Sequence, residues 1–211
     1  MPPGYPIVVA LAGRPVLVVG AGPVATRKVT GLLGTGAVIR VVAPQALPGL
    51  AALADAGRIT LDRRPYRTGD LDGAALAFAA GPPEVNRRVA ADAGAAGVAV
   101  NVADDPGAGS FTTPATLRRG ELLVAVATGG LAPGLAGALR RRLGLVFGPE
   151  WAELVELLAS VRDRLPAAAD TEGWDRLLDG PLPAAVRSGD HAGALRILAE
   201  LAGTRATDGS E

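Results

Sequence analysis

The sequence contains no cysteine and only one histidine, His191. The absence of cysteine excludes disulfide scaffolds, thiolate metal sites, iron–sulfur clusters and cysteine nucleophiles. A single histidine also excludes a histidine-rich metal site. Any chemistry must therefore come from carboxylates, hydroxyls, backbone amides or a bound cofactor.

Aromatic residues make up only 3% of the 211 residues, and 21 basic side chains balance 21 acidic ones. Neither a base-stacking surface nor a field that attracts nucleic acid or an anionic membrane is expected. No apolar run approaches the ~20 residues of a membrane span, and the first residues lack the basic region of a signal peptide. We therefore expect a cytoplasmic protein with neither nucleic acid nor membrane as a partner.

The first half of the chain alternates strand and helix patterns. Five apolar runs predict strands, at residues 16–19, 38–42, 59–61, 74–80 and 98–102. Three segments between them predict helices, at residues 23–33, 47–56 and 84–96. Repeated strand–helix units with short links predict an α/β fold, a Rossmann-type doubly wound parallel sheet over residues 1–112.

The pattern changes in the second half. Residues 110–113 and 122–127 predict two strands separated by Arg118-Arg119-Gly120, followed by a helix at 133–145. Beyond residue 149 only helices are predicted, at 151–165, 172–178 and 191–201, before a polar tail that we expect to be frayed. We expect a small α+β dimerisation segment at 113–148 and a helical domain at 149–211. The first of these is too small and apolar for a core of its own, so a second copy of the chain would cover it.

The strongest motif is the glycine turn at residues 20–25, Gly20-Ala21-Gly22-Pro23-Val24-Ala25, between an apolar strand and a helix. Gly20 permits a tight turn, and Gly22 lets a pyrophosphate approach the backbone. Ala25 lets helix and strand pack closely, and Pro23 and Val24 open a helix whose free N–H groups favour phosphate. We predict a dinucleotide site here; the alternative is a tight turn that binds nothing.

The acidic residue that usually holds the adenosine ribose is missing from the end of the second strand. Val42, Ala43 and Pro44 stand in this region instead. We therefore expect Ala43 and Pro44 to contact the cofactor without a carboxylate. Arg40 suggests the 2′-phosphate of NADP, but it lies inside the strand, where a solvated or packed arginine is the alternative.

Two further segments could carry chemistry. Asp104 and Asp105 follow the last predicted parallel strand, where ligands of open α/β sheets bind. A carboxylate there could accept a proton while a hydride leaves, although Asp-Asp-Pro-Gly is also an ordinary turn sequence. Thr128-Gly129-Gly130 precedes a predicted helix and could form a second anion-binding turn or a plain connection.

These motifs, in this order, resemble the precorrin-2 dehydrogenase family, the N-terminal module of siroheme synthase. Residues 18–28 look like that family's VGGGxVAxRK. Further similar segments follow at residues 41–44, 101–104, 110–115, 128–133 and 135–143. The resemblance covers roughly residues 5–146. The chain departs from the pattern at Gly81-Pro82-Pro83, where the family often has Thr-Asp-Asp.

The resemblance implies oxidation of precorrin-2 to sirohydrochlorin, with NAD as the hydride acceptor and Asp104 as the essential acid. It also implies that some members insert ferrous iron, and that the enzyme is a homodimer. Thr128, Gly129, Gly130, Arg118 and Arg119 would then bind the substrate, because arginine pairs well with the carboxylates of a tetrapyrrole. A solvated arginine face is the alternative.

Two other functions are compatible with a glycine turn of this kind. One is a non-catalytic Rossmann regulator that senses NAD or binds a ligand, which would not need Asp104. The other is a dehydrogenase for a different small molecule, although the chain has no Tyr-xxx-Lys pair. Oxidation of precorrin-2 in the presence of NAD separates all three.

Overall fold

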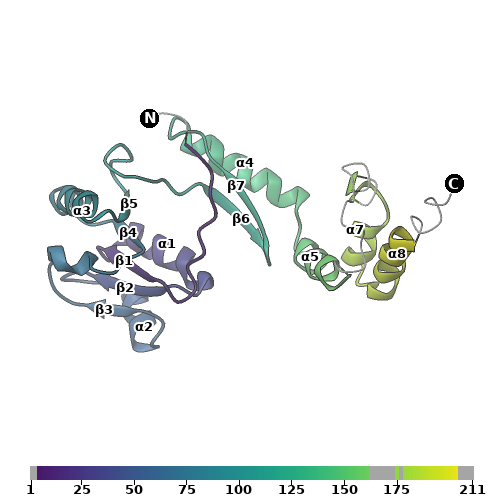
Figure 1. Ribbon diagram of the computed structural model, residues 1–211, viewed down its shortest axis with the longest axis horizontal. Helices are drawn as coiled ribbons and strands as arrows, with labels where there is room; N and C mark the ends of the chain where they lie inside the picture. Colours follow the sequence, from purple (N-terminus) through teal and green to yellow (C-terminus); the bar gives the residue numbers. More distant parts are fainter. Residues whose placement is uncertain (1–3, 162–173, 176–177, 204–211) are drawn as a thin grey trace. The chain divides into compact units, whose positions relative to one another are not determined.

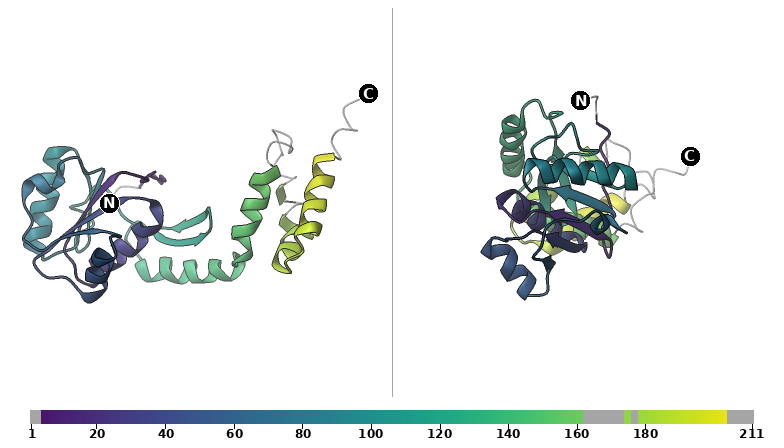
Figure 2. Two further views of the ribbon diagram at one scale, coloured as in Figure 1. Left: turned by 90° about the horizontal axis from the view of Figure 1, so that it is seen from below. Right: turned by 90° about the vertical axis from the view of Figure 1, so that its left-hand side faces the viewer.

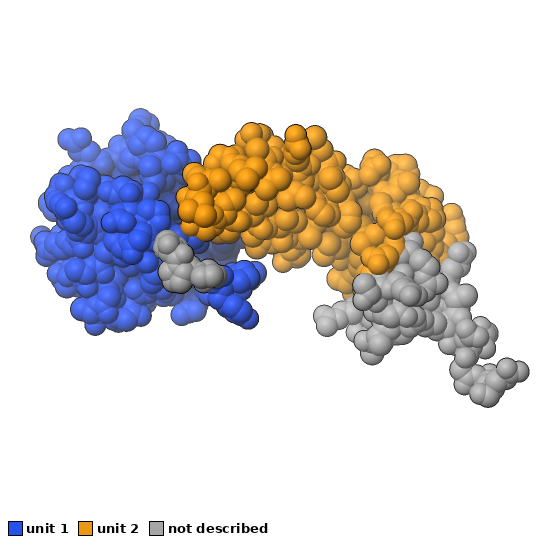
Figure 3. Space-filling model, turned by 90° about the horizontal axis from the view of Figure 1, so that it is seen from above, with its two compact units in different colours: residues 1–113 blue, residues 114–211 orange. Residues whose placement is uncertain are grey.

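The computed structural model describes residues 4–161, 174–175 and 178–203. The chain divides into two compact units, residues 1–113 and residues 114–211 (Figure 3). Within the described residues, no helix combines the length and the apolar content needed to cross a membrane.

The first unit is built on a five-stranded parallel sheet in the order β3-β2-β1-β4-β5 (Figure 1). The strands are β1 (Pro15–Val19), β2 (Val38–Val42), β3 (Thr60–Asp62), β4 (Leu76–Ala79) and β5 (Ala99–Val102). The helices between them are α1 (Pro23–Leu32), α2 (Pro48–Asp55) and α3 (Pro83–Ala96). Short 3-10 turns η1 (Leu33–Thr35) and η2 (Thr68–Leu71) complete the connections. The Rossmann-type sheet predicted from the sequence is confirmed.

Apolar side chains cover both faces of this sheet, which explains the continuous apolar runs of its strands. Val16 and Val18 of β1 belong to one core cluster, together with Ala25 and Val29 of α1 and Leu50 of α2. The neighbouring β1 residues, Leu17 and Val19, belong to a second cluster, together with residues of α3 and η2. The alternation along β1 therefore places helices on opposite faces of the sheet (Figure 2).

The second unit begins with an antiparallel hairpin of β6 (Ala115–Arg119) and β7 (Leu122–Val126), on which α4 (Pro133–Val146) packs. The part of the chain that the structure describes beyond α4 contains the helices α5 (Glu150–Val161), α7 (Leu182–Arg187) and α8 (His191–Gly203). Among the described residues these helices share a buried core of Leu154, Leu182, Val186, Ala194 and Leu198.

The strand expected at residues 110–113 is wrong. Ser110 and Phe111 both donate backbone N–H bonds to the Val100 carbonyl, at 2.8 and 3.4 Å, so no regular ladder forms there. The first hairpin strand is β6, and Arg118 and Arg119 lie within it rather than between two strands. Gly120, with φ of 55°, opens the two-residue turn that joins Arg119 to Leu122. The arginine pair had suggested a loop, although β6 alternates exposed and buried residues as a strand does.

The C-terminal helices match the sequence only in part. Helix α5 occupies the first part of the helix expected at 151–165, and α8 matches the one expected at 191–201. Helix α7 was not predicted; Pro183 lies in its first turn, where a proline is tolerated. The expected helix at 172–178 and the polar tail fall largely or wholly outside the described residues.

Candidate functional site

The glycine turn after β1 has two positions with different structural requirements. Gly20 has φ of 106°, and a Cβ on it would collide with the backbone carbonyl of Ala80. Only glycine fits both constraints. Gly22 has an ordinary φ of −85°, and a Cβ there would meet nothing within 4 Å. Gly20 is therefore required by the fold, whereas the space beside Gly22 is open.

A cavity of about 450 Å³ lies beside this turn. Nine residues from the carboxyl ends of β1, β2 and β4 line it: Gly20, Ala21, Gly22, Ala43, Pro44, Gln45, Ala80, Gly81 and Pro82. Ligands of open α/β sheets bind at this edge. Four residues that the sequence singled out for cofactor binding, Gly20, Gly22, Ala43 and Pro44, thus share one cavity.

The amino-terminal end of α1 faces this turn. Gly22 is the N-cap and Pro23 the first helical residue, and neither a capping side chain nor an acidic residue occupies the first turn. The backbone N–H groups that start at Val24 and the helix dipole therefore favour an anion at this end. Ala25 is fully buried against the sheet, where a larger side chain would push the helix away. Open space at Gly22 together with an uncapped helix start fits the pyrophosphate of a dinucleotide.

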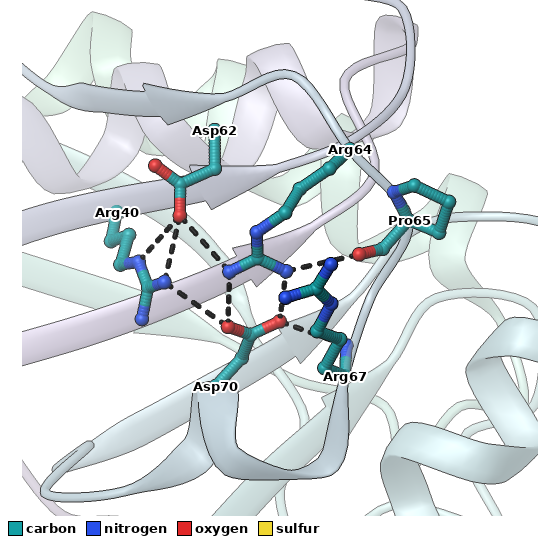
Figure 4. Close-up of polar contacts among 6 residues, drawn as sticks. All are labelled: Arg40, Asp62, Arg64, Pro65, Arg67 and Asp70. Atoms are coloured by element: carbon teal, nitrogen blue, oxygen red, sulfur yellow. Dashed lines mark hydrogen bonds and ion pairs between the residues drawn. The ribbon is translucent and has the colours of Figure 1, made fainter.

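Arg40 belongs to an ion-pair network (Figure 4) and is not among the residues that line the cavity. Its guanidinium donates to Asp62 at 2.7 and 3.0 Å and to Asp70 at 3.1 Å. Arg64 donates to the same two carboxylates, at 2.6 and 2.9 Å to Asp70 and 3.2 Å to Asp62. The hydrogen bond from Arg64 lowers the pKa of Asp70 below its ordinary value, although burial opposes this effect. The packed interpretation of Arg40 therefore accounts for its contacts.

Asp104 and Asp105 follow β5 but have different partners. One oxygen of Asp104, Oδ1, accepts a 2.6 Å hydrogen bond from Nδ2 of Asn86 on α3, and the Asp104 residue is exposed. Asp105 accepts from the backbone N–H groups of Gly107 and Ala108, at 3.0 and 3.3 Å. These are the contacts of a turn-forming aspartate. The structure thus separates a carboxylate fixed by a side chain from one that closes its own loop.

Asn86 was missed by the sequence analysis. It is only 2% exposed, and its Oδ1 accepts a 2.9 Å hydrogen bond from the backbone N–H of Gly81, which lines the cavity. Asn86 therefore joins the cavity wall to Asp104 through two hydrogen bonds. A polar residue at a position of α3 that faces the core was the one available signal, because a buried amide needs partners.

Lys28, the single lysine of the chain, ties α1 to the end of the first unit. Its ammonium group donates to Thr113 Oγ1 at 2.6 Å and lies 5.6 Å from the centre of the Phe78 ring. Phe111 packs edge-on against Phe78, with ring centres 5.4 Å apart. Burial, with a smaller contribution from Arg27, lowers the pKa of Lys28. These contacts hold residues 111–113, which follow the Asp104 loop, against the core.

The predicted substrate residues lie in the second unit. Gly129 and Gly130 have φ of 61° and 82°, and Thr128 Oγ1 accepts a 3.2 Å bond from the Ala132 N–H. Arg118 is exposed, whereas Arg119 donates to the Phe147 carbonyl at 3.0 Å. The contacts described for these residues are all within the second unit, whereas the cavity and Asp104 belong to the first unit. Among the described residues, no group of three or more histidine, aspartate or glutamate side chains could hold a metal ion.

A family model described as "Putative NAD(P)-binding" matches residues 7–115, which include the whole parallel sheet, the glycine turn and Asp104. The chain belongs to this family. The dinucleotide site predicted at the glycine turn, and the nicotinamide cofactor that the resemblance implied, agree with the family.

Relatives of this NAD(P)-binding chain extend the likeness beyond the matched domain. It is 42% identical to siroheme synthase of Chromobacterium violaceum over 196 residues, 90% of this chain and 42% of that protein. It is also 42% identical to siroheme synthase of Azotobacter vinelandii over 200 residues, 92% of this chain and 43% of that protein. The chain thus spans less than half the length of these relatives.

A solved structure covers nearly the same span. The precorrin-2 dehydrogenase SirC superposes with a TM-score of 0.69 and 25% sequence identity, over 94% of this chain and 98% of SirC. The resemblance to the precorrin-2 dehydrogenase and siroheme synthase family that the sequence motifs indicated is confirmed.

Proposed function

We propose that this protein oxidises precorrin-2 to sirohydrochlorin in siroheme biosynthesis, with NAD as the hydride acceptor. The observation that carries the proposal is the junction of the glycine-lined cavity and Asp104 through Asn86, within one unit. The relatives, siroheme synthase and the precorrin-2 dehydrogenase SirC, support the choice of substrate.

The reaction removes two hydrogens from the macrocycle, one as a hydride and one as a proton. A bound NAD would supply the hydride acceptor. The first turn of α1 would hold its pyrophosphate at the backbone N–H groups, and Ala43 and Pro44 would lie beside the adenosine half. The Asp104 carboxylate accepts the proton, because a carboxylate within reach of the substrate acts as a general base.

The choice of NAD over NADP rests on the ion-pair network. A 2′-phosphate needs a guanidinium or ammonium group that is not already neutralised. Arg40 and Arg64 each donate to both Asp62 and Asp70, so neither presents an uncompensated charge. NAD, which has no such phosphate, is therefore the better match.

Arg118 and Arg119, with the Thr128-Gly129-Gly130 turn, would bind the carboxylates of the tetrapyrrole. Arg118 is exposed and free to form such a pair, whereas Arg119 already donates to Phe147 and would act beside it. Insertion of ferrous iron and a cytoplasmic location stay predictions, the first from the resemblance and the second from composition.

The protein would work as a homodimer. Helix α4 exposes Leu135, Leu139 and Val146, which are 54%, 38% and 62% accessible and recur on one helical face. Only Leu117 and Ala136 are buried apolar residues within β6, β7 and α4. A second copy of the chain would cover this apolar stripe, which is exposed to solvent in a single chain.

The test is a spectroscopic assay of purified protein with enzymatically prepared precorrin-2. We expect the absorption spectrum of sirohydrochlorin to appear in step with NADH when NAD is added, and much more slowly with NADP. Binding of NAD without oxidation would favour the non-catalytic regulator instead. Oxidation of another hydroxy or amino substrate, with precorrin-2 unchanged, would favour a different dehydrogenase.

A further inference from the structure

Asn86 has contacts that neither packing nor helix formation requires. It lies in α3, where its neighbours on the buried face, Val89 and Ala93, are apolar. Its two polar ends are both used: Oδ1 accepts from the Gly81 N–H at 2.9 Å, and Nδ2 donates to Asp104 Oδ1 at 2.6 Å. Gly81 follows β4 and Asp104 follows β5, so one amide spans two adjacent strand ends.

The chemistry of the two partners explains why an amide stands here. Gly81 offers a donor and the Asp104 carboxylate offers acceptors, so the bridging group must accept at one end and donate at the other. An amide does both without a charge, which matters at a position that is only 2% exposed. An apolar residue would leave the Gly81 N–H without this partner and would remove the hydrogen bond that orients Asp104.

We propose that Asn86 is the positioning residue of the site: it orients the Asp104 carboxylate and sets the wall of the cofactor cavity at the same time. The proposal rests on the proposed function, in which Asp104 accepts the proton. With Oδ1 bonded to Asn86, the proton of the substrate goes to Oδ2 of Asp104. Because Gly81 lines the cavity, displacement of Asn86 affects both cofactor binding and proton transfer.

Two substitutions separate these two effects. Asn86→Ala removes both hydrogen bonds, so we expect weaker NAD binding by calorimetry and a decrease of about 100-fold in kcat, as for other misplaced catalytic groups. Asn86→Asp keeps an acceptor for the Gly81 N–H but replaces the donor with a second carboxylate beside Asp104. We expect this variant to bind NAD as the wild type does.

The pH dependence of Asn86→Asp is the readout that a merely structural role would not change. Two carboxylates at hydrogen-bond distance share a proton and titrate as a pair. We therefore expect the pH profile of kcat to gain an ionisation that is present in neither the wild type nor Asn86→Ala. A profile parallel to that of the wild type would overturn the proposal.

Asp92 provides the matched control on the same helix. It accepts a 3.0 Å hydrogen bond from the Tyr66 hydroxyl and belongs to neither the cavity nor the Asp104 contact. We expect Asp92→Ala to lower the melting temperature of the protein while kcat and NAD affinity stay at wild-type values. This variant shows what the loss of side-chain contacts of α3 away from the site does, here the Tyr66 hydrogen bond and the ion pair with Arg88 at 3.8 Å.

Asp104→Ala in the same assay distinguishes a failure of the proposed function from a failure of the proposed role of Asn86. If the wild type does not oxidise precorrin-2, or if Asp104→Ala retains full turnover, the proposed function or its general base is wrong. If Asp104→Ala is inactive while folded Asn86→Ala turns over as fast as the wild type, only the role of Asn86 is refuted. Circular dichroism and the NAD titration establish that each variant is folded.

Discussion

The two units of this chain use apolar residues in opposite ways. In the first unit both faces of a parallel sheet are covered by helices, and every residue of β1 after Pro15 is at most 2% exposed. In α4 of the second unit and the loop before it, leucines remain accessible, with Leu145 of α4 87% and Leu131 of the loop 93% exposed. The first unit completes its own core, whereas this part of the second does not.

The difference indicates what each unit contributes to the proposed function. A rigid, self-contained sheet can hold backbone groups in place, and the cofactor cavity is lined by glycine, alanine, proline and one glutamine. An apolar surface that stays accessible suits association with another chain. Variants that affect one unit and spare the other test this division.

The largest expected effect comes from the glycine turn of the first unit. Gly22→Asp should abolish NAD binding, because a carboxylate would enter the space proposed for the pyrophosphate and repel it. The fold should survive, since a Cβ at Gly22 meets nothing within 4 Å and aspartate is a favoured N-cap. Calorimetry measures the binding and thermal unfolding the stability.

Gly20→Ala is the counterpart. Its new Cβ would collide with Ala80, and its φ of 106° is strained for alanine, so we expect the first unit to unfold more easily. If Gly22→Asp retained NAD affinity, the glycine turn would have no part in the cofactor site.

The next effect concerns the two aspartates after β5. Asp104→Ala should lower the turnover of precorrin-2 by about 10²–10⁴-fold, or about 3–5.5 kcal/mol, while NAD still binds. Asp105→Asn should cost far less, because the asparagine oxygen can still accept from Gly107 and Ala108. Turnover at saturating NAD compares the two, and the reverse order would place the base one residue further along.

A third variant addresses the accessible apolar face of the second unit. Leu135→Asp places a charge in the α4 stripe, and we expect a dimer at micromolar concentration to become a monomer in light scattering. Arg141→Ala changes the net charge by the same amount at another exposed position of α4 and should leave the dimer intact. If the wild-type protein is a monomer at this concentration, the proposed homodimer is wrong.

The smallest effect is expected at the ion-pair network of the first unit. Asp70 is buried and its pKa is lowered from an unfolded value of 3.8, chiefly by Arg64. Its contribution to stability is therefore complete above that value and is lost as the pH falls through the folded pKa. Asp70→Asn should cost on the order of 2 kcal/mol at pH 7 and progressively less below pH ~4.

Hydrogen exchange of the β1 and β2 amides measures the stability that Asp70→Asn removes from the first unit. Tryptophan fluorescence would not report it, because Trp151 and Trp174 both lie in the second unit. An equal loss of protection at pH 7 and at pH 3 would contradict the assignment to an ionised Asp70.

Local sequence patterns predicted much of the structure of the first unit. The apolar runs predicted all five strands because both faces of a parallel sheet are buried, and Gly20 and Gly22 marked the turn because backbone conformation and approach depend on glycine. Their position after the last parallel strand singled out Asp104 and Asp105 together, because residues that follow a parallel strand lie at the ligand-binding edge. Only the family resemblance chose Asp104 between them. The hairpin was misplaced because Arg118 and Arg119 suggested a loop, although strands with one exposed face carry polar residues at alternate positions.

Contacts between distant residues were decided by the tertiary structure alone. Arg40 meets Asp62 and Asp70, 22 and 30 residues away, and Asn86 meets Asp104 across 18 residues. Periodicity shows which residues face the core, but the partner of a buried polar group depends on which strands become neighbours. The sequence by itself determined the sheet and the glycine turn, and the family resemblance singled out the Asp104 carboxylate. Only the packing of α3 beside β4 and β5 decided that an amide joins that carboxylate to the cavity wall.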